Sequence, residues 1–228
     1  MDLKRAILFD LDGTLIDTTN LILRCFDHSW QTVCGLTHPR ESLVETFGVP
    51  LREAMIRLAA ASNAPLPSVV ETSASLDLIE RLLTEYRCFN VANHDHMVDT
   101  FEGVEEVLIA LRSRGYLIGL VTSKSRELAL RGLRVCSLEP LIDAAVFLED
   151  TRSHKPGPEP VLTALERLNA DASSAAYVGD SRHDIVAGRR AGVRTVAAGW
   201  GPAPRAELEE EGPDYFADSV HDLLEFFE

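Results

Sequence analysis

Five short apolar runs, separated by segments with helical spacing, constrain the fold of this chain more than any other feature. The hydrophobicity within each run is continuous rather than alternating, which is typical of strands buried on both faces of a parallel sheet. The expected strands are residues 6–9, 117–121, 144–148, 175–178 and 194–197.

The segments between these runs predict helices. Residues 102–114 place apolar side chains on one helical face, and Gly115 is a typical C-terminal stop. A second helix is expected to open at Pro158, and a third to cover 185–191 before Gly192. Strands that alternate with helices in this way indicate an α/β fold, a Rossmann-like core with a parallel sheet.

One connection breaks this rhythm, because residues 10–116 separate the first strand from the second, far more than an ordinary crossover. Most of it carries amphipathic helix patterns, over 21–33, 51–61 and 69–88, with a loop at 63–68. We therefore expect a catalytic core formed by 1–16 and 99–228, and an inserted α-helical cap domain at 17–98.

Charge and cysteine usage narrow the function classes. The 228 residues hold 36 Asp and Glu against 22 Lys and Arg, a net charge of −14, which disfavours nucleic acid and membrane surfaces as partners. No apolar run is long enough for a membrane span or a signal peptide, so a cytoplasmic protein is expected, as a monomer or homodimer. The four cysteines show no CxxC spacing and are expected to be reduced, buried thiols.

The first strand is followed by Asp10-Leu11-Asp12-Gly13-Thr14, at the sheet edge where open α/β proteins bind ligands. Residues two apart in an extended segment point the same way, so both carboxylates can face one pocket. Like charges this close predict a shared proton or a bound cation. Taken alone, the segment is equally well explained as a solvated turn.

Three further polar segments follow the other strands: Val121-Thr122-Ser123-Lys124, then His154-Lys155-Pro156-Gly157-Pro158, and Val178-Gly179-Asp180-Ser181 with Asp184 nearby. Each has a plain structural explanation by itself. Together they supply carboxylates for a divalent cation, a hydroxyl and backbone N–H groups for oxyanions, and a lysine charge. That inventory is typical of phosphoryl transfer.

In this order the motifs resemble those of the haloacid dehalogenase superfamily, and 9–17 resembles its phosphoglycolate phosphatase-like and pyrophosphatase-like branch. The resemblance implies that Asp10 is the nucleophile and Asp12 the acid and base. It also implies that Thr122 and the Ser123 N–H hold phosphate, and that Lys155 offsets charge. Mg²⁺ is expected on Asp10, the main-chain carbonyl of Asp12, and Asp180, with Asp184 beside them or ligating directly.

Asp12 discriminates within the superfamily, since dehalogenases need no proton donor at this position and phosphonatases lack an acid there. It favours C–O–P or P–O–P cleavage, so the expected function is Mg²⁺-dependent hydrolysis of a small anionic phosphorylated metabolite. The nearest alternatives are a sugar-phosphate mutase of the same superfamily and a non-enzymatic phospho-switch or binding protein. A receiver domain carries similar acids but is about half as long and has no cap.

The cap is expected to choose the substrate, with phosphoglycolate and pyrophosphate as leading candidates. The segment from Phe47 to Arg52 resembles the cap loop that approaches the substrate in these phosphatases. Gly48 and Arg52 are the candidate substrate-binding residues, Arg52 for a remote carboxylate or second phosphate. A solvated arginine in the first turn of a helix explains Arg52 equally well.

Overall fold

The computed structural model describes residues 4–62 and 73–227, with the side chains of 73–75 left aside. The chain divides into two compact units. The first comprises Met1–Asp17 and Val98–Glu228, and the second comprises Thr18–Met97. Each unit is described by itself.

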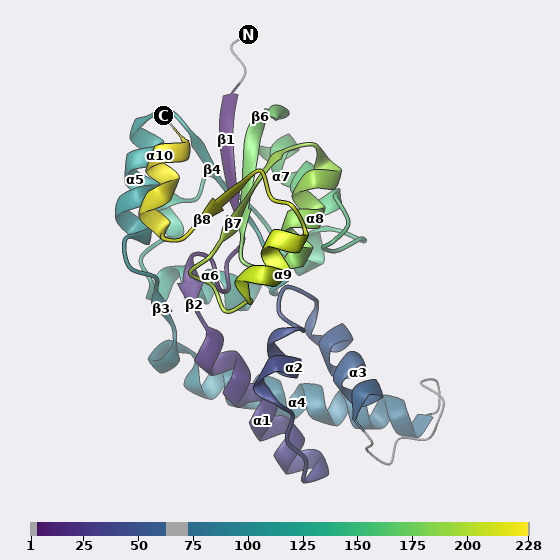
Figure 1. Ribbon diagram of the computed structural model, residues 1–228. Coiled ribbons are helices and arrows are strands. Elements are labelled where there is room, and N and C mark those ends of the chain that lie inside the picture. Colours follow the sequence, from purple (N-terminus) through teal and green to yellow (C-terminus); the bar gives the residue numbers. More distant parts are fainter. Residues whose placement is uncertain (1–3, 63–72, 228) are drawn as a thin grey trace. The chain divides into compact units, whose positions relative to one another are not determined.

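The first unit is built on a parallel sheet of six strands in the order β5-β4-β1-β6-β7-β8 (Figure 1). Because β1 lies between β4 and β6, the segments that follow these three strands meet at one edge of the sheet. The strands are β1 Lys4–Phe9, β4 Leu117–Val121, β5 Ala144–Val146, β6 Ala170–Gly179, β7 Arg194–Ala198 and β8 Tyr215–Ala217.

Helices cover both faces of this sheet, with α7 and α8 on one side and α5 and α10 on the other (Figure 1). Side chains of β1, β6, α7 and α8, including Leu8, Tyr177, Leu165 and Ala187, share one buried cluster. The helices of this unit are α5 Val104–Ser113, α6 Arg126–Val135, α7 Glu159–Leu168, α8 Arg182–Ala191, α9 Arg205–Glu210 and α10 Leu223–Phe226.

The architecture confirms the predicted α/β class, since a strand is found at each of the five apolar runs. The third run ends earlier than expected, at Val146, because the chain turns into a 3₁₀ turn at Leu148–Asp150. The Asp150 carboxylate accepts a hydrogen bond from the Phe147 N–H and closes that turn. The strand β8 was not predicted from the sequence.

The described part of the second unit is helical, in the region where the sequence predicted an inserted helical segment. They are α1 Thr19–Cys34, α2 Arg40–Val44, α3 Leu51–Ala61 and α4 Ser73–Met97. Phe26 of α1 and Tyr86 of α4 meet edge to face, with ring centroids 5.0 Å apart. The predicted loop at 63–68 and the start of the predicted 69–88 helix lie outside the described residues.

A two-stranded antiparallel pair stands at the junction of the two units in sequence, and was not predicted. β2 Ile16–Asp17 pairs with β3 Asp99–Thr100, so Asp17 lies opposite Asp99. The chain therefore leaves and re-enters the first unit at neighbouring positions.

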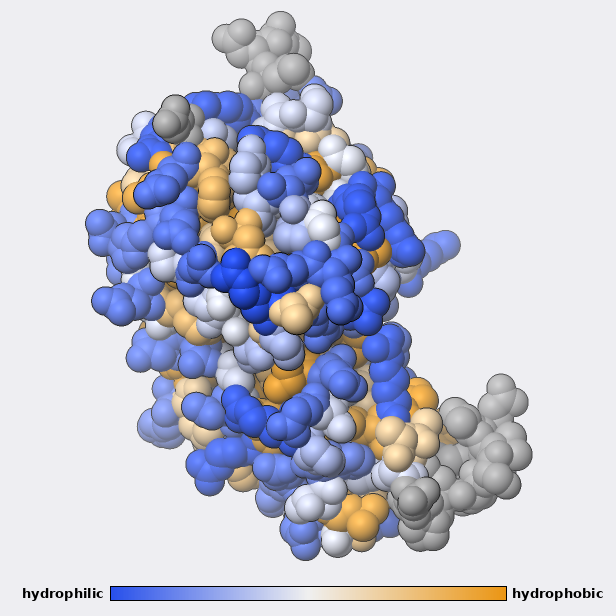
Figure 2. All heavy atoms as spheres, in the orientation of Figure 1, coloured by the Kyte–Doolittle hydropathy of each residue, from blue (hydrophilic) through white to orange (hydrophobic). Residues whose placement is uncertain are grey.

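The thiols and the surface complete the description. All four cysteines are free, but only Cys25 is buried and Cys88 is exposed, which corrects the expectation of buried thiols. On the face drawn in Figure 2, hydrophilic residues predominate and apolar ones form small separate groups. Among the described residues, none of the helices has the length and apolarity that a membrane span requires.

Candidate active site

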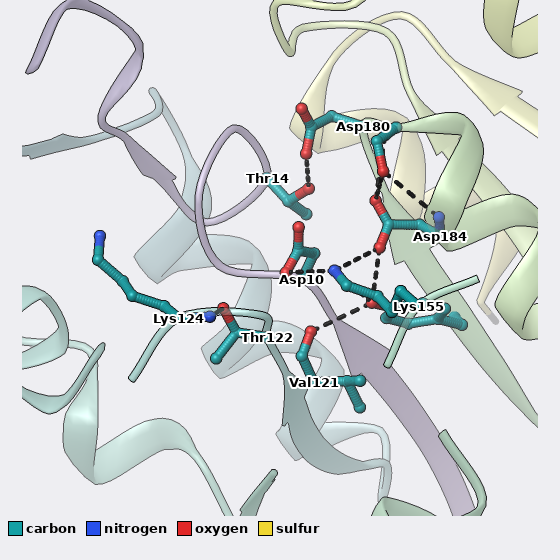
Figure 3. Close-up of polar contacts among 10 residues, drawn as sticks. Asp10, Thr14, Val121, Thr122, Lys124, Lys155, Asp180 and Asp184 are labelled. Carbon is teal, nitrogen blue, oxygen red and sulfur yellow. Dashed lines mark hydrogen bonds and ion pairs between the residues drawn. The ribbon is translucent and has the colours of Figure 1, made fainter. Parts of the chain in front are cut away.

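Polar side chains gather where β1, β4 and β6 end. Asp10 follows β1, Thr122 follows β4 and Asp180 follows β6, and each is at most 5% exposed. Figure 3 shows Lys155 and Asp184 converging on the same place. Four of the five side chains are ionisable, so the chemistry of this edge is dominated by charge.

Asp10 sits at the start of a tight turn. Its N–H donates to the carbonyl of Val178 at 2.9 Å, which extends the ladder between β1 and β6 by one residue. The chain then reverses, with the N–H of Gly13 donating to the carbonyl of Ile16. Gly13 has φ +83°, and a Cβ there would lie 2.3 Å from Asp180 Oδ2. This position therefore needs glycine for both its backbone conformation and its space.

The same turn fixes Asp180. The Thr14 hydroxyl donates to Asp180 Oδ1 at 2.8 Å. Trp200 in turn donates its indole N–H to the Thr14 carbonyl at 3.0 Å. The loop after β7 thus braces the loop after β1, and a metal-ligand candidate is held in one orientation.

Lys155 lies at the centre of the carboxylates, 1% exposed at its side chain. Its Nζ lies 2.9 Å from Asp10 Oδ1 and 2.7 Å from Asp184 Oδ1. It also lies 3.3 Å from the hydroxyl oxygen of Tyr177. The single positive charge therefore bridges two acids from different elements.

Asp184 belongs to the first turn of α8 and is fully buried. Ser181 caps this helix, and the Ser181 N–H and hydroxyl both donate to Asp184 Oδ2, at 3.1 and 2.5 Å. Tyr177 donates to Asp184 Oδ1 at 2.8 Å. These donors hold the carboxylate ionised and fixed.

The acids differ in their proton affinity. Burial, which outweighs the opposing charge of Lys155, raises the pKa of Asp10 to about 7, and Asp184 adds to the rise. Burial, with Asp10 and Asp184 nearby, raises the pKa of Asp180 well above its usual value. Burial works in the same direction on Asp184, but Lys155 and the hydrogen bonds lower the pKa of Asp184 below its usual value. Burial would lower the pKa of Lys155, yet Asp10 and Asp184 raise it.

Three of these carboxylates are arranged as a metal site would require. One oxygen from each of Asp10, Asp180 and Asp184 lies within 4.8 Å of the others. Carboxylate oxygens are the hard donors that Mg²⁺ and Ca²⁺ prefer. Lys155 offsets only one of the three negative charges, so a divalent cation fits both the donors and the charge.

The loop after β4 presents the remaining core residues. The Thr122 N–H donates to the Val146 carbonyl at 3.0 Å, and the Thr122 hydroxyl accepts the Lys124 N–H at 3.1 Å. Ser123 lies between them. Lys124 extends to the first loop, where its Nζ lies 2.6 Å from Asp12 Oδ1. This ion pair connects the Asp12 side chain to the loop after β4.

The two candidates from the helical segment belong to the second unit. Gly48 lies in the turn before α3 with φ +80°. Arg52 lies in the first turn of α3 and forms an exposed ion pair with Glu80 of α4. Their contact with a substrate stays a prediction.

No functional role was predicted for Tyr177, Lys124, Thr14 or Trp200, and Trp200 was expected to be a packing residue. Tyr177 lies within an apolar run, where a tyrosine is indistinguishable from a packing residue. Lys124 and Thr14 stand inside motifs, yet their partners are 112 and 166 residues away in the sequence. The spacing of residues within a motif does not predict hydrogen bonds to partners so distant in the sequence.

Comparison with known proteins agrees with the geometry. Residues 7–198 match the family described as haloacid dehalogenase-like hydrolases, which covers the sheet through β7 and the whole helical unit. The chain belongs to this family. It is therefore a hydrolytic enzyme, and the resemblance drawn from its motifs is confirmed.

Relatives place this hydrolase in the pyrophosphatase-like and phosphoglycolate phosphatase-like branch. It is 41% identical over 219 residues to a Caldanaerobacter subterraneus protein provisionally named pyrophosphatase PpaX, covering 96% of this chain and 92% of the other. It is 37% identical to the pyrophosphatase PpaX of Bacillus cereus, with 96% and 94% covered. Its fold matches a predicted phosphoglycolate phosphatase from Haemophilus somnus, with TM-score 0.84 and 22% identity over the full length of both.

Proposed function

We propose that this enzyme hydrolyses a small phosphorylated metabolite in the presence of Mg²⁺, through an aspartyl-phosphate formed on Asp10. The observation that carries the proposal is the buried cluster of Asp10, Asp180 and Asp184 around Lys155 at the carboxyl ends of parallel strands. Phosphoryl transfer depends mainly on positioning and charge neutralisation, which is what this cluster provides.

The proposed roles are those that the family resemblance implies for the matching residues. Asp10 attacks phosphorus and forms the aspartyl-phosphate while the bond from phosphorus to the leaving oxygen breaks. Asp12 gives that oxygen a proton, and then takes a proton from the water that attacks the same phosphorus. The attack of water breaks the bond to Asp10 and releases phosphate. Thr122 and the Ser123 N–H bind the phosphoryl oxygens.

Charge decides whether Asp10 can act. A carboxylate whose pKa is about 7 is partly protonated at neutral pH and is then a poor nucleophile. Lys155, beside Asp10, favours the ionised form. When bound by Asp10, Asp180, Asp184 and the Asp12 carbonyl, Mg²⁺ would supply the remaining positive charge for these acids and for the phosphate.

The relatives support pyrophosphate as the leading substrate, with phosphoglycolate second. PpaX proteins at 37–41% identity carry the pyrophosphatase name, whereas the phosphoglycolate phosphatase likeness is one of fold. We also propose that residues 17–98 act as a cap that selects the substrate, with Gly48 and Arg52 facing it.

The test is hydrolysis of p-nitrophenyl phosphate, pyrophosphate, phosphoglycolate and hexose phosphates with Mg²⁺ and with EDTA. We expect turnover that needs Mg²⁺ and that Asp10→Asn abolishes. Turnover by Asp10→Asn, or in EDTA, contradicts the mechanism. Isomerisation of a hexose phosphate without release of phosphate would instead identify a mutase.

A further inference from the structure

Lys124 forms an ion pair that the mechanism above does not use. Its Nζ lies 2.6 Å from Asp12 Oδ1, and the two side chains are 11% and 21% exposed. Lys155, in contrast, is 1% exposed and lies between Asp10 and Asp184. Of these two lysines in the site, Lys124 is the one that a molecule from solvent can reach.

The loop holds Lys124 on both sides. Its N–H donates to the Thr122 hydroxyl at 3.1 Å, and its carbonyl accepts the Leu148 N–H at 3.1 Å. Thr122 is itself hydrogen-bonded to the Val146 carbonyl through its N–H. The backbone of Lys124 is therefore fixed to the segment that carries the proposed phosphate-binding hydroxyl.

We propose that Lys124 is a specificity-determining residue that binds an anionic leaving group, such as the second phosphate of pyrophosphate or the carboxylate of phosphoglycolate. The inference rests on the proposed function. There Asp12 protonates the leaving oxygen, which must come within about 3 Å of its carboxyl group. An ammonium that touches the same carboxyl group then lies within about 8 Å of that oxygen, near enough for a flexible lysine to contact the charge beyond it.

The charge balance points the same way. Four acids of the site, Asp10, Asp12, Asp180 and Asp184, would repel a leaving group that carries its own negative charge. The Lys155 ammonium is engaged by two of them. Lys124 sits beside the acid that meets the leaving oxygen, so it can offset the repulsion where the departing charge is.

A simpler role for Lys124 would be to hold Asp12 in position. The two roles give different results among substrates whose leaving oxygens need a proton to the same degree, because a misplaced Asp12 slows all of these substrates, whereas a missing leaving-group contact slows only the anionic ones. The readout is therefore the ratio of kcat/KM between substrates, not activity on one substrate.

The experiment compares Lys124→Gln with the wild-type enzyme on pyrophosphate, phosphoglycolate and glycerol 3-phosphate, whose leaving alcohol is uncharged but needs a proton from Asp12 as that of phosphoglycolate does. We expect kcat/KM for the two anionic leaving groups to fall about tenfold more than for glycerol 3-phosphate, as loss of a charged contact predicts. Lys124→Arg should restore most of the preference. Lys4→Gln, which removes the same charge at the opposite end of β1, should leave all three values unchanged.

An equal loss on all three substrates would overturn the inference and leave the proposed function standing. A wild-type enzyme that hydrolyses none of them would overturn both. If thermal melting shows that Lys124→Gln does not fold, Lys124→Met, which keeps the aliphatic part of the side chain and removes the charge, takes its place in the same comparison. A selective loss on the anionic leaving groups supports the inference, and an equal loss on all three substrates overturns it.

Discussion

The hydroxyl of Tyr177 ties together three groups at the base of the site. It lies 3.3 Å from Lys155 Nζ, 2.8 Å from Asp184 Oδ1 and 3.1 Å from the Val121 carbonyl. The hydroxyl can accept a hydrogen bond from Lys155 and donate its one proton to Asp184. Because it is also fully buried, it orders these two side chains and does not itself contact the substrate. It is a positioning residue.

Removal of this hydroxyl should therefore affect turnover more than substrate binding. We expect Tyr177→Phe to lower kcat on pyrophosphate about tenfold with little change in KM, since Lys155 loses one of its fixed partners. The free energy of unfolding should fall by about 1–2 kcal/mol, because buried polar groups lose a partner. Steady-state kinetics and urea unfolding measure the two effects.

Tyr215→Phe is the matched control, because Tyr215 lies at 37% exposure on β8 and outside the site. It should change neither kcat nor KM. A Tyr177→Phe enzyme with wild-type kcat and a raised KM would contradict a positioning role.

The acid–base behaviour of Asp10 predicts a pH dependence of stability in EDTA. Its pKa is about 7 in the folded protein against an ordinary value of 3.8, so between these values the folded state binds a proton that the unfolded chain has lost. Stability from this residue therefore falls as the pH rises from about 4 to about 7. Asp10→Asn lacks this titration.

The measurement is urea unfolding of both proteins in EDTA at pH 5 and pH 8. Relative to wild type, Asp10→Asn should be more stable at pH 8 than at pH 5. Saturating Mg²⁺ should reduce the difference at pH 8, because it binds the ionised wild-type site better. Parallel pH profiles for the two proteins would refute the shift in the pKa of Asp10.

At the residue scale, the sequence predicted the aspartates of the site but not the side chains that hold them in position. Asp10, Asp180 and Asp184 stand in recognisable motifs and meet at one sheet edge. Tyr177, Trp200 and the ion pair of Lys124 depend on side-chain packing between distant segments. Such contacts depend on which strands are neighbours in the sheet. The hydrophobic pattern of each segment predicts that it is a strand, but not which strand lies beside it.

At the element scale, the turn after β1 is tested by a pair of glycines. Gly13 and Gly115 both have φ +83°, which disfavours a side chain. A Cβ on Gly13 would meet the Asp180 carboxylate at 2.3 Å, whereas a Cβ on Gly115 would meet nothing within 4 Å. The two alanine variants thus share backbone strain and differ in the displacement of Asp180.

We expect Gly13→Ala and Gly115→Ala each to lower the free energy of unfolding by about 1–3 kcal/mol through backbone strain. Gly13→Ala alone should weaken Mg²⁺ binding, by roughly 10–100-fold, the usual effect of disturbing a ligand's surroundings. Isothermal titration calorimetry with Mg²⁺ measures the difference. Equal Mg²⁺ affinity in the two variants would show that Asp180 tolerates the new methyl group.

Elements were predictable where hydrophobic pattern alone sets them. α3 was expected at 51–61, and the structure has it at Leu51–Ala61. In contrast, β8 spans three residues and the β2–β3 pair spans two residues a side, too short for a period to show. α6 was not predicted, although Gly132 and Leu133 stand three and four residues after Ala129 and all three are buried on one face of the helix.

At the scale of the whole molecule, the separation into two units follows from where the chain crosses between them. Asp17 and Asp99 face each other in an antiparallel pair, so the ends of the segment between them are neighbours. The strands of the sheet and the five core site residues all belong to the first unit. A sheet whose strands and covering helices are all present has what it needs to fold alone.

We therefore expect a variant in which an Asn-Gly turn replaces residues 18–98 to fold and to bind Mg²⁺. Such a turn is suited to joining Asp17 to Asp99, because a two-residue loop matches the twist of an antiparallel pair. Far-UV circular dichroism should show less helix but a cooperative melting transition, and Mg²⁺ should raise the Tm.

Hydrolysis of p-nitrophenyl phosphate by this variant should persist while discrimination among metabolites declines, since Gly48 and Arg52 are removed. The same excision in Asp10→Asn, which should show no turnover, is the control. A product that aggregates or melts without cooperativity would mean that the sheet needs the helical unit in order to fold. The helical unit would then stabilise the enzyme as well as select its substrate.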